Sequence, residues 1–264
     1  MKTACIYIWG LISFACCPVL GVTPLNGPIQ PLKQGHFSTG LEYVHSNLDV
    51  ESENTSLGPI QLPQNKIKDV ELDRIFFVPS YAIFDFLTIS GRIGVNRMDV
   101  DSGANSDNFG GQVGTSNWDF AAGGSIRAVL YKKDRFSWLA SGIFTWTDLD
   151  GFNQVTTVLN GVPVSGKLKL SLYDYQFSTG PAYEFVDGWL LSAGPYFQFI
   201  DGHAHLSASA AGAEFKTTVD IDQIDYFGGY VSSVLQLKED FSWNVRFSAT
   251  GSGYTIATGI VKAF

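Results

Sequence analysis

The stretch YTIATGIVKAF, residues 254–264, contains the pattern that decides the fold of this chain. The residues at every second position of this stretch are Tyr254, Ile256, Thr258, Ile260, Lys262 and Phe264. A period of two is the period of a β-strand whose two faces meet different surroundings. The stretch therefore predicts a strand with one large, mostly apolar face, and the chain before it repeats the pattern.

The same alternation predicts ten strands, at 36–46, 69–83, 87–97, 118–130, 136–146, 173–185, 189–200, 218–236, 241–249 and 254–264. Short turns at 84–86, 132–135, 186–188 and 238–240 alternate with long polar stretches at 47–66, 100–116, 149–165 and 201–216, and a GSG at 251–253 precedes the last strand. This order is typical of an up-and-down antiparallel barrel. Eight or twelve strands remain open because 218–236 is weakly patterned, and Pro79 predicts a bulge or bend.

Three features predict that the apolar face meets lipid. The other face carries Gly, Ser and Thr with few charges, whereas a soluble barrel would expose Lys and Glu. Tryptophans stand near strand ends, as the two interfaces of a bilayer select, and the predicted aromatic girdle is Trp118, Trp138, Trp146, Trp189 and Trp243. The strands reach the roughly 9–11 residues of a tilted crossing. The fold class is all-β, a single antiparallel transmembrane β-barrel, and a secreted all-β protein is the alternative.

Composition excludes one class of partner. Charged residues make up only 16% of the chain, and the formal net charge is −8. A nucleic-acid partner requires a basic surface, so no nucleic acid is expected.

The N-terminal residues predict export. An uncharged, mostly apolar run predicts a signal peptide at 1–21, a Pro-containing periplasmic lead at 22–35 and the barrel at 36–264. The three cysteines fall inside the predicted signal, so no disulfide is expected in the mature chain. The alternative is a lipoprotein acylated at Cys16 or Cys17.

The C-terminal alternation ending in Phe264 resembles the terminal signature of bacterial outer-membrane barrels. The stretch FFVPSYAIFDFLTISGRIG, residues 76–94, is similar to the second hairpin of the small OmpA-like and opacity-like porin family. The resemblance implies an outer-membrane location, with the short turns in the periplasm. It also implies that the barrel assembly machinery reads the last strand through Tyr254, Ile256, Ile260 and Phe264.

The polar face carries charges of both signs, which predicts a charge network in the lumen: Glu42, Arg92, Asp119, Arg127, Asp174, Glu184, Asp225 and Arg246. A barrel of ten strands has room for little more than side chains or one small ligand. Ion pairs that fill the lumen are therefore predicted, and a constricted pore lined by the same groups is the alternative.

Acidic and histidine residues near two strand ends are weak catalytic candidates: Asp99, Asp101, Asp201 and His203. Omptin proteases are also ten-stranded barrels and use an Asp pair and an Asp–His pair at the outer mouth. Here the strand parity turns Asp99, Asp201 and His203 toward the lipid-facing row, so no catalytic site is predicted. His203 and His205 with Asp201 could supply metal ligands, but no metal and no cofactor are predicted.

The predicted function is a structural or surface-interaction role in the outer membrane, without enzymatic activity. A narrow porin for small solutes is the alternative, and an omptin-like or lipid-modifying enzyme is a third class. The expected partners are outer-membrane lipid and lipopolysaccharide, the assembly machinery, and an extracellular ligand bound through the outer loops.

Overall fold

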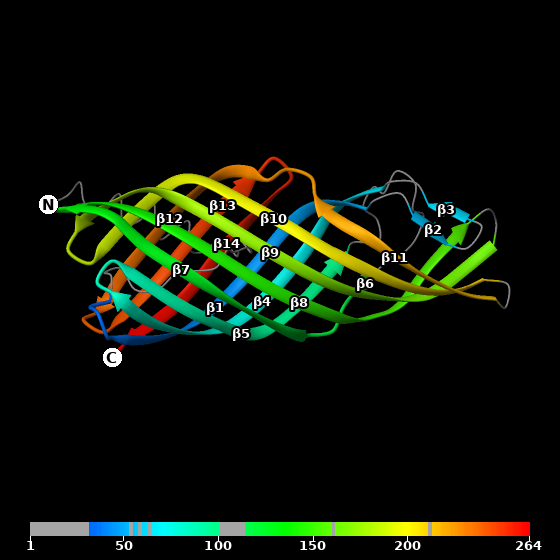
Figure 1. Ribbon diagram of the computed structural model, residues 1–264, viewed down its shortest axis with the longest axis horizontal. Helices are drawn as coiled ribbons and strands as arrows, with labels where there is room; N and C mark the ends of the chain where they lie inside the picture. The colour runs from blue at the N-terminus through cyan, green and yellow to red at the C-terminus, as the bar shows by residue number, and fades with distance from the viewer. Residues whose placement is uncertain are drawn as a thin grey trace, which may run out of the picture.

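The computed structural model describes residues 32–52, 55–57, 60–62, 65–100, 114–159, 162–210 and 213–264. The predicted signal peptide, most of the predicted lead and Asp101 lie outside these ranges. Ten long strands form the barrel: β1 (Phe37–Ser52), β4 (Asn65–Phe84), β5 (Leu87–Val100), β7 (Asp119–Lys133), β8 (Phe136–Leu159), β9 (Val162–Val186), β10 (Trp189–Ala210), β12 (Phe227–Lys238), β13 (Phe241–Thr250) and β14 (Gly253–Ala263) (Figure 1). In the described ranges, no helix is long and apolar enough to cross a membrane.

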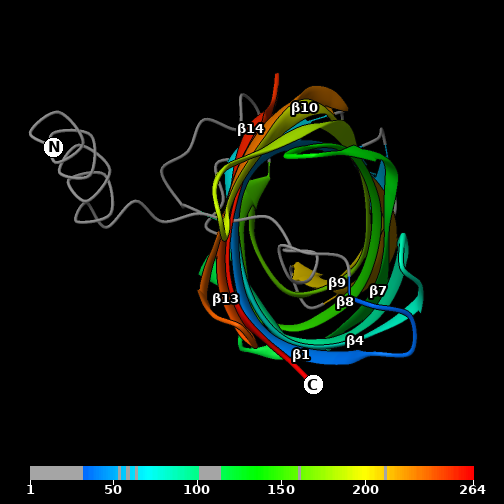
Figure 2. The ribbon, with the colours of Figure 1, turned by 90° about the vertical axis from the view of Figure 1, so that its left-hand side faces the viewer.

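The barrel closes between its first and last strands. β1 pairs antiparallel with β4 on one side and with β14 on the other, where the register runs from Ser38↔Ala263 to Leu48↔Gly253. The backbone N–H of Phe264 donates a hydrogen bond to the carbonyl oxygen of Phe37 at 2.8 Å. Figure 2 shows the resulting ring of strands along its axis. The prediction of a ten-stranded antiparallel barrel is confirmed, and every long strand has a hydrogen-bonded neighbour on both sides, as hydrocarbon requires.

Four two-residue turns join strands at the end of the barrel where β14 ends, at residues 85–86, 134–135, 187–188 and 239–240. Asp134 and Gly188 have φ of 51° and 86°, the left-handed conformation that such tight turns use. These turns match the four short connections predicted from the sequence. We call this end of the barrel the turn end and the opposite one the outer end.

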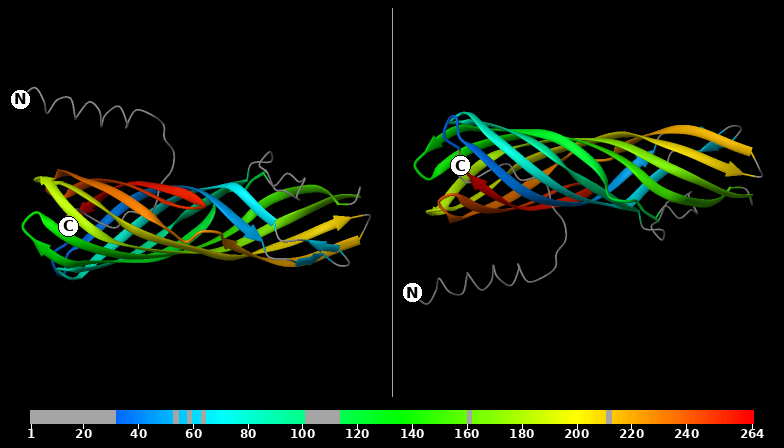
Figure 3. Two further views of the ribbon diagram at one scale, coloured as in Figure 1. Left: turned by 90° about the horizontal axis from the view of Figure 1, so that it is seen from above. Right: turned by 90° about the horizontal axis from the view of Figure 1, so that it is seen from below.

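The outer end is longer than the sequence predicts. β8, β9 and β10 contain 24, 25 and 22 residues, and the segments 149–165 and 201–216, predicted as polar loops, are mostly strand. Figure 3 shows these strands continuing beyond the rest of the barrel. The additional short strands are β2 (Thr55–Leu57), β3 (Ile60–Leu62) and β6 (Gly114–Thr115). A crossing takes roughly 9–11 residues, so about half of each long strand lies outside a bilayer.

The weakly patterned segment 218–236 contains parts of two strands. β11 (Ala213–Gln223) pairs with the outer part of β10, and β12 pairs with its lower part. The β13–β14 hairpin turns at 251–252, which leaves the edge of β1 open beyond that level. β11 pairs there with β1, through Val50↔Gln223, Glu51↔Asp222 and Ser52↔Ile221. One pairing partner thus replaces another, and the ring of strands stays closed at this level.

The predicted bulge at Pro79 is wrong. The β1–β4 register runs without a shift from Phe37↔Tyr81 to Leu48↔Val70, through Thr39↔Pro79. The β4–β5 ladder lacks pairs for Val78 and Pro79 but resumes in the same register. Proline has no N–H to donate, so hydrogen bonds are lost from the ladder between the strands. No extra residue is inserted into the strand, and the register is therefore kept. The shift lies instead at Asp69, which has φ of 55°.

Polarity reverses along the strands. On β5, Ile93 and Val95 face outward, and Arg92 and Asn96 on the other face are buried. From the next outward position on, the polarity is the opposite: Arg97 and Asp99 face outward, and Met98 and Val100 are buried. The same reversal occurs on β4 and β9. Hydrocarbon surrounds the first level and water the second, so the apolar side chains change from the outer to the inner face.

Candidate functional site

The interior of the turn-end half contains two buried ion pairs. Arg92 donates from Nη2 to Oε1 of Glu42 at 2.5 Å and from Nη1 to Oγ1 of Thr145 at 3.0 Å. Its guanidinium also lies 4.1 Å from the centre of the Phe76 ring. Both charged side chains are at most 3% exposed. The two charges are thus paired with each other inside the barrel.

The second pair joins Arg74 and Asp174, with Nη1 and Oδ2 at 2.5 Å. Gln176 donates to the same carboxylate at 3.0 Å, and Gln198 donates to it at 3.2 Å. Arg74 is absent from the predicted network because 69–83 is apolar on both parities near its middle. The available signal was its strand parity: Arg74 lies four residues before Val78, and therefore on the same face of the strand.

The structure places the eight predicted lumen residues in different environments. Glu42, Arg92, Asp174 and Arg246 are buried inside the barrel, and Arg127 is half-buried there. The other three make different contacts. Asp119 accepts the backbone N–H of Asp150 at 3.0 Å, Glu184 accepts that of Gly188 in a turn at 2.9 Å, and Asp225 is exposed in the β11–β12 connection. The sequence pattern assigned Asp225 to the interior because the alternation of residues does not reveal the break between β11 and β12.

Aliphatic side chains fill the interior beyond the ion pairs. This apolar core consists of Leu48, Val50, Val70, Leu72, Met98, Val100, Leu149, Leu170, Leu172, Ile200, Ala204 and Ile221, with Ile67, Leu168 and Val219 packed against it. Its members come from β1, β4, β5, β8, β9, β10 and β11. The sequence did not predict it, because five of these twelve residues, Leu48, Val50, Val100, Leu149 and Ala204, fall in stretches read as loops.

The predicted girdle residues face outward. Trp138, Trp189 and Trp243 lie near the turn end, and Trp189 and Trp243 flank Leu235 in the sheet register. Each of the three indole N–H groups donates to a hydroxyl on a neighbouring strand, to Thr179, Ser233 and Thr258 respectively. Trp118 is exposed, and Trp146 packs edge-on against Phe120 at 6.1 Å. Satisfied indole donors suit a position at the edge of the hydrocarbon.

The residues of the predicted assembly signal lie on the outer face of β14. Tyr254, Ile260 and Phe264 are exposed and Ile256 is half-buried. The Phe264 ring lies 6.3 Å from that of Phe37, with Lys262 above it at 5.3 Å. The four side chains thus form part of the surface beside the closing seam between β1 and β14.

The catalytic candidates do not meet across the barrel mouth. His203 bonds through Nδ1 to Oδ1 of Asp220 on β11 at 2.6 Å, rather than to Asp201, and both partners are half exposed on the outer face. Asp99 lies beside Arg97 at 3.8 Å on β5. No cluster of three metal-ligating side chains occurs among the described residues.

Three carboxylates lie side by side on this outer face. Asp222 is directly opposite Asp201 on one side and Glu51 on the other. Burial, followed by the charges of Asp201, Asp220 and Glu51, raises the pKa of Asp222. A raised carboxyl pKa means that the folded state holds the proton more tightly, so ionisation of Asp222 opposes folding.

We therefore expect Asp222→Asn to raise the free energy of unfolding at pH 7 by roughly 0.2–1 kcal/mol, the scale of a cross-strand charge pair. The gain should shrink as pH falls below the usual carboxyl pKa, since Asp222 of the wild type is then protonated, and uncharged, in both the folded and the unfolded chain. Urea unfolding at pH 7 and pH 3 measures it, with Asp240→Asn, at the turn end, as the control. An equal gain at both pH values would contradict this account.

Sequence comparison finds no relative: no protein-family model and no curated protein matches the chain. Solved structures do match. The outer membrane protease OmpT from Escherichia coli superposes with a TM-score of 0.53 at 7% identity, over 87% of this chain and 97% of that one. The outer membrane protein OprG from Pseudomonas aeruginosa does so with a TM-score of 0.50 at 13% identity, over 89% and 99%. In its fold and its apolar outer face, the chain is similar to small bacterial outer-membrane β-barrels.

Proposed function

We propose that this protein is a closed outer-membrane barrel with a structural or surface-interaction role, and that it conducts no solute. The observation that carries the proposal is the apolar core, which fills the outer part of the interior. Leu72, Leu149 and Leu172, from β4, β8 and β9, are each at most 3% exposed within it.

A solute would have to pass two layers of different chemistry. The first contains the Arg92–Glu42 and Arg74–Asp174 ion pairs, in which each buried charge already has a partner of opposite sign. The second is the aliphatic core, where an ion would lose its hydration without gaining a polar partner. Either layer alone opposes conduction, and together they support a closed lumen over the narrow porin.

The outer extension supports a role in surface contact. β8, β9, β10 and β11 project beyond the apolar outer belt and present polar side chains on their outer face, among them Asp148, Lys169, His203 and Asp220. A rigid sheet with its own dry core can hold the connecting loops in fixed positions, as recognition requires. The belt below would contact lipid and lipopolysaccharide, the last strand would engage the assembly machinery, and an extracellular ligand would bind to the extension.

The absence of enzymatic activity is part of the proposal. Its support is geometric: the candidate His203 pairs with Asp220, and both side chains lie on the outer face of the barrel wall. This pair therefore faces away from the interior of the barrel, where a substrate could be shielded from water.

Planar-bilayer recording tests the proposal. Protein that shows a mobility shift on heating, and is therefore a folded barrel, should give no steady conductance after insertion. A known open porin in the same bilayer is the control for insertion and detection. Steady ohmic conductance from the heat-modifiable protein would overturn the closed barrel and favour the narrow porin.

A further inference from the structure

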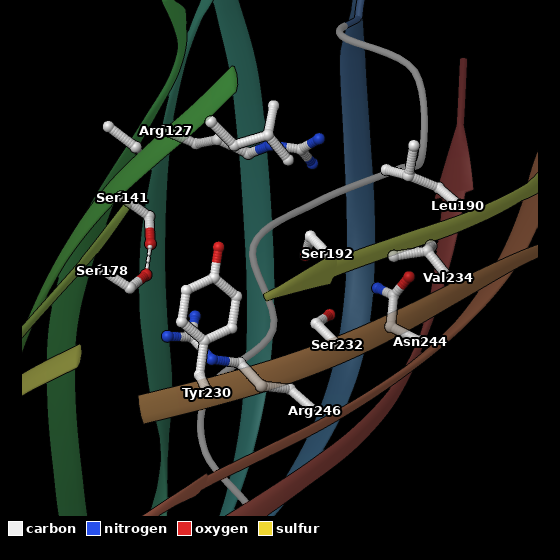
Figure 4. Close-up of a pocket in the computed structure, with 12 residues that line it drawn as sticks. Arg127, Ser141, Ser178, Leu190, Ser192, Tyr230, Ser232, Val234, Asn244 and Arg246 are labelled. Atoms are coloured by element: carbon white, nitrogen blue, oxygen red, sulfur yellow. Dashed lines mark hydrogen bonds between the residues drawn. The ribbon is translucent and has the colours of Figure 1, made fainter. Parts of the chain in front are cut away.

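A cavity of about 50 Å³ lies inside the turn-end half of the barrel (Figure 4). The described residues that line it come from β7, β8, β9, β10, β12 and β13. Two rows of direct cross-strand neighbours form much of its wall. One row is Arg127, Ser141 and Ser178, and the other is Ser192, Ser232 and Arg246. An arginine thus stands at one end of each serine row.

The polar lining consists of cations and neutral groups. No carboxyl group is among the described residues that line the cavity. The two carboxylates buried deepest in the lumen, Glu42 and Asp174, are bound to Arg92 and Arg74. Two guanidinium groups and several hydroxyls therefore border one small space in which the described lining supplies no negative charge.

Arg246 is held rigidly in this lining. Its side chain is 6% exposed, its guanidinium lies 4.3 Å from the centre of the Tyr230 ring and 5.5 Å from that of Tyr196, and its Nε has no hydrogen-bond partner among the described residues. Figure 4 shows the Tyr230 ring over this guanidinium. Aromatic faces stabilise a cation only in part. A buried charge with an unused donor is costly unless an anion accompanies it.

We propose that this cavity binds one small inorganic oxyanion such as phosphate. Guanidinium groups match the oxygens of a tetrahedral oxyanion, and serine hydroxyls can rotate to donate to the remaining oxygens. The small volume of the cavity suits one such anion. The anion supplies a negative charge, which the described lining of the cavity lacks. The site goes beyond the proposed closed barrel.

Equilibrium dialysis of the folded, detergent-solubilised protein against radiolabelled inorganic phosphate tests the site. The background salt is sodium gluconate, because its anion is too large for the cavity. We expect saturable binding of one phosphate per chain. Arg246→Gln should weaken it by roughly tenfold or more, since it removes a charged donor, and Ser232→Ala should weaken it by less. The Ser232 variant keeps all charges and therefore still reports if Arg246→Gln fails to fold.

Arg135→Gln is the matched control. It removes one arginine from an exposed ion pair with Asp187 at the turn end, outside the cavity lining, and should leave the affinity for phosphate unchanged. No saturable binding by the wild-type protein would overturn the proposal. So would equal affinity in the wild type and in every folded variant of the cavity, or a loss in Arg135→Gln as large as that in Arg246→Gln.

Discussion

Replacing Asp174 with alanine is expected to lower the free energy of unfolding by about 3–5 kcal/mol, the scale for breaking a buried ion pair. Arg74 and Asp174 are at most 2% exposed, with Nη1 and Oδ2 at 2.5 Å. The substitution leaves the guanidinium without its partner and also removes the acceptor of Gln176 and Gln198. Urea unfolding of the barrel in phospholipid vesicles, followed by tryptophan fluorescence, measures the change.

Two variants separate this effect from a general loss of charge. Asp187→Ala removes a carboxylate whose side chain is 94% exposed and should cost no more than about 1 kcal/mol. The double variant Arg74→Met with Asp174→Leu removes both charges and should recover most of the stability, because no charge is then buried alone. A loss below 1 kcal/mol in Asp174→Ala would show that the pair does not hold the lumen together.

The second large effect is expected in the apolar core. Leu72→Ala should lower the free energy of unfolding by about 2–5 kcal/mol, since Leu72 is 2% exposed and the barrel wall around it cannot collapse into the space. The neighbouring Glu71 faces outward and is exposed, so Glu71→Ala should change stability by no more than about 0.5 kcal/mol.

This pair of variants tests the reversal of polarity directly, again by urea unfolding. If the level of the barrel that contains Leu72 and Glu71 were an ordinary membrane crossing, its outward side chains would carry the stability and its inward ones would not. Comparable losses in Leu72→Ala and Glu71→Ala would therefore contradict a dry apolar core at this level.

The alternation in the sequence was sufficient for the barrel because one-sided burial follows from the period of two alone. Residues such as Ile89, Ile93 and Val95 report the lipid-facing side of β5 without reference to any other strand. Arg92 and Glu42 could be assigned to the interior on the same grounds, although their partnership could not be known. The assignment failed where strand boundaries were misjudged, as at Asp225, or where both parities were apolar, as around Arg74.

The sequence by itself determined the class of fold, the ten strands, the short turns and the face that meets lipid, because each depends on residues close together in the chain. Only the tertiary structure decided which charges pair, that β11 replaces β14 beside β1, and that aliphatic residues in apparent loops form a core. These depend on the register between strands far apart in sequence. A register cannot be obtained from the pattern of one strand, because sliding a neighbour by two residues keeps every side chain on its face while changing every partner.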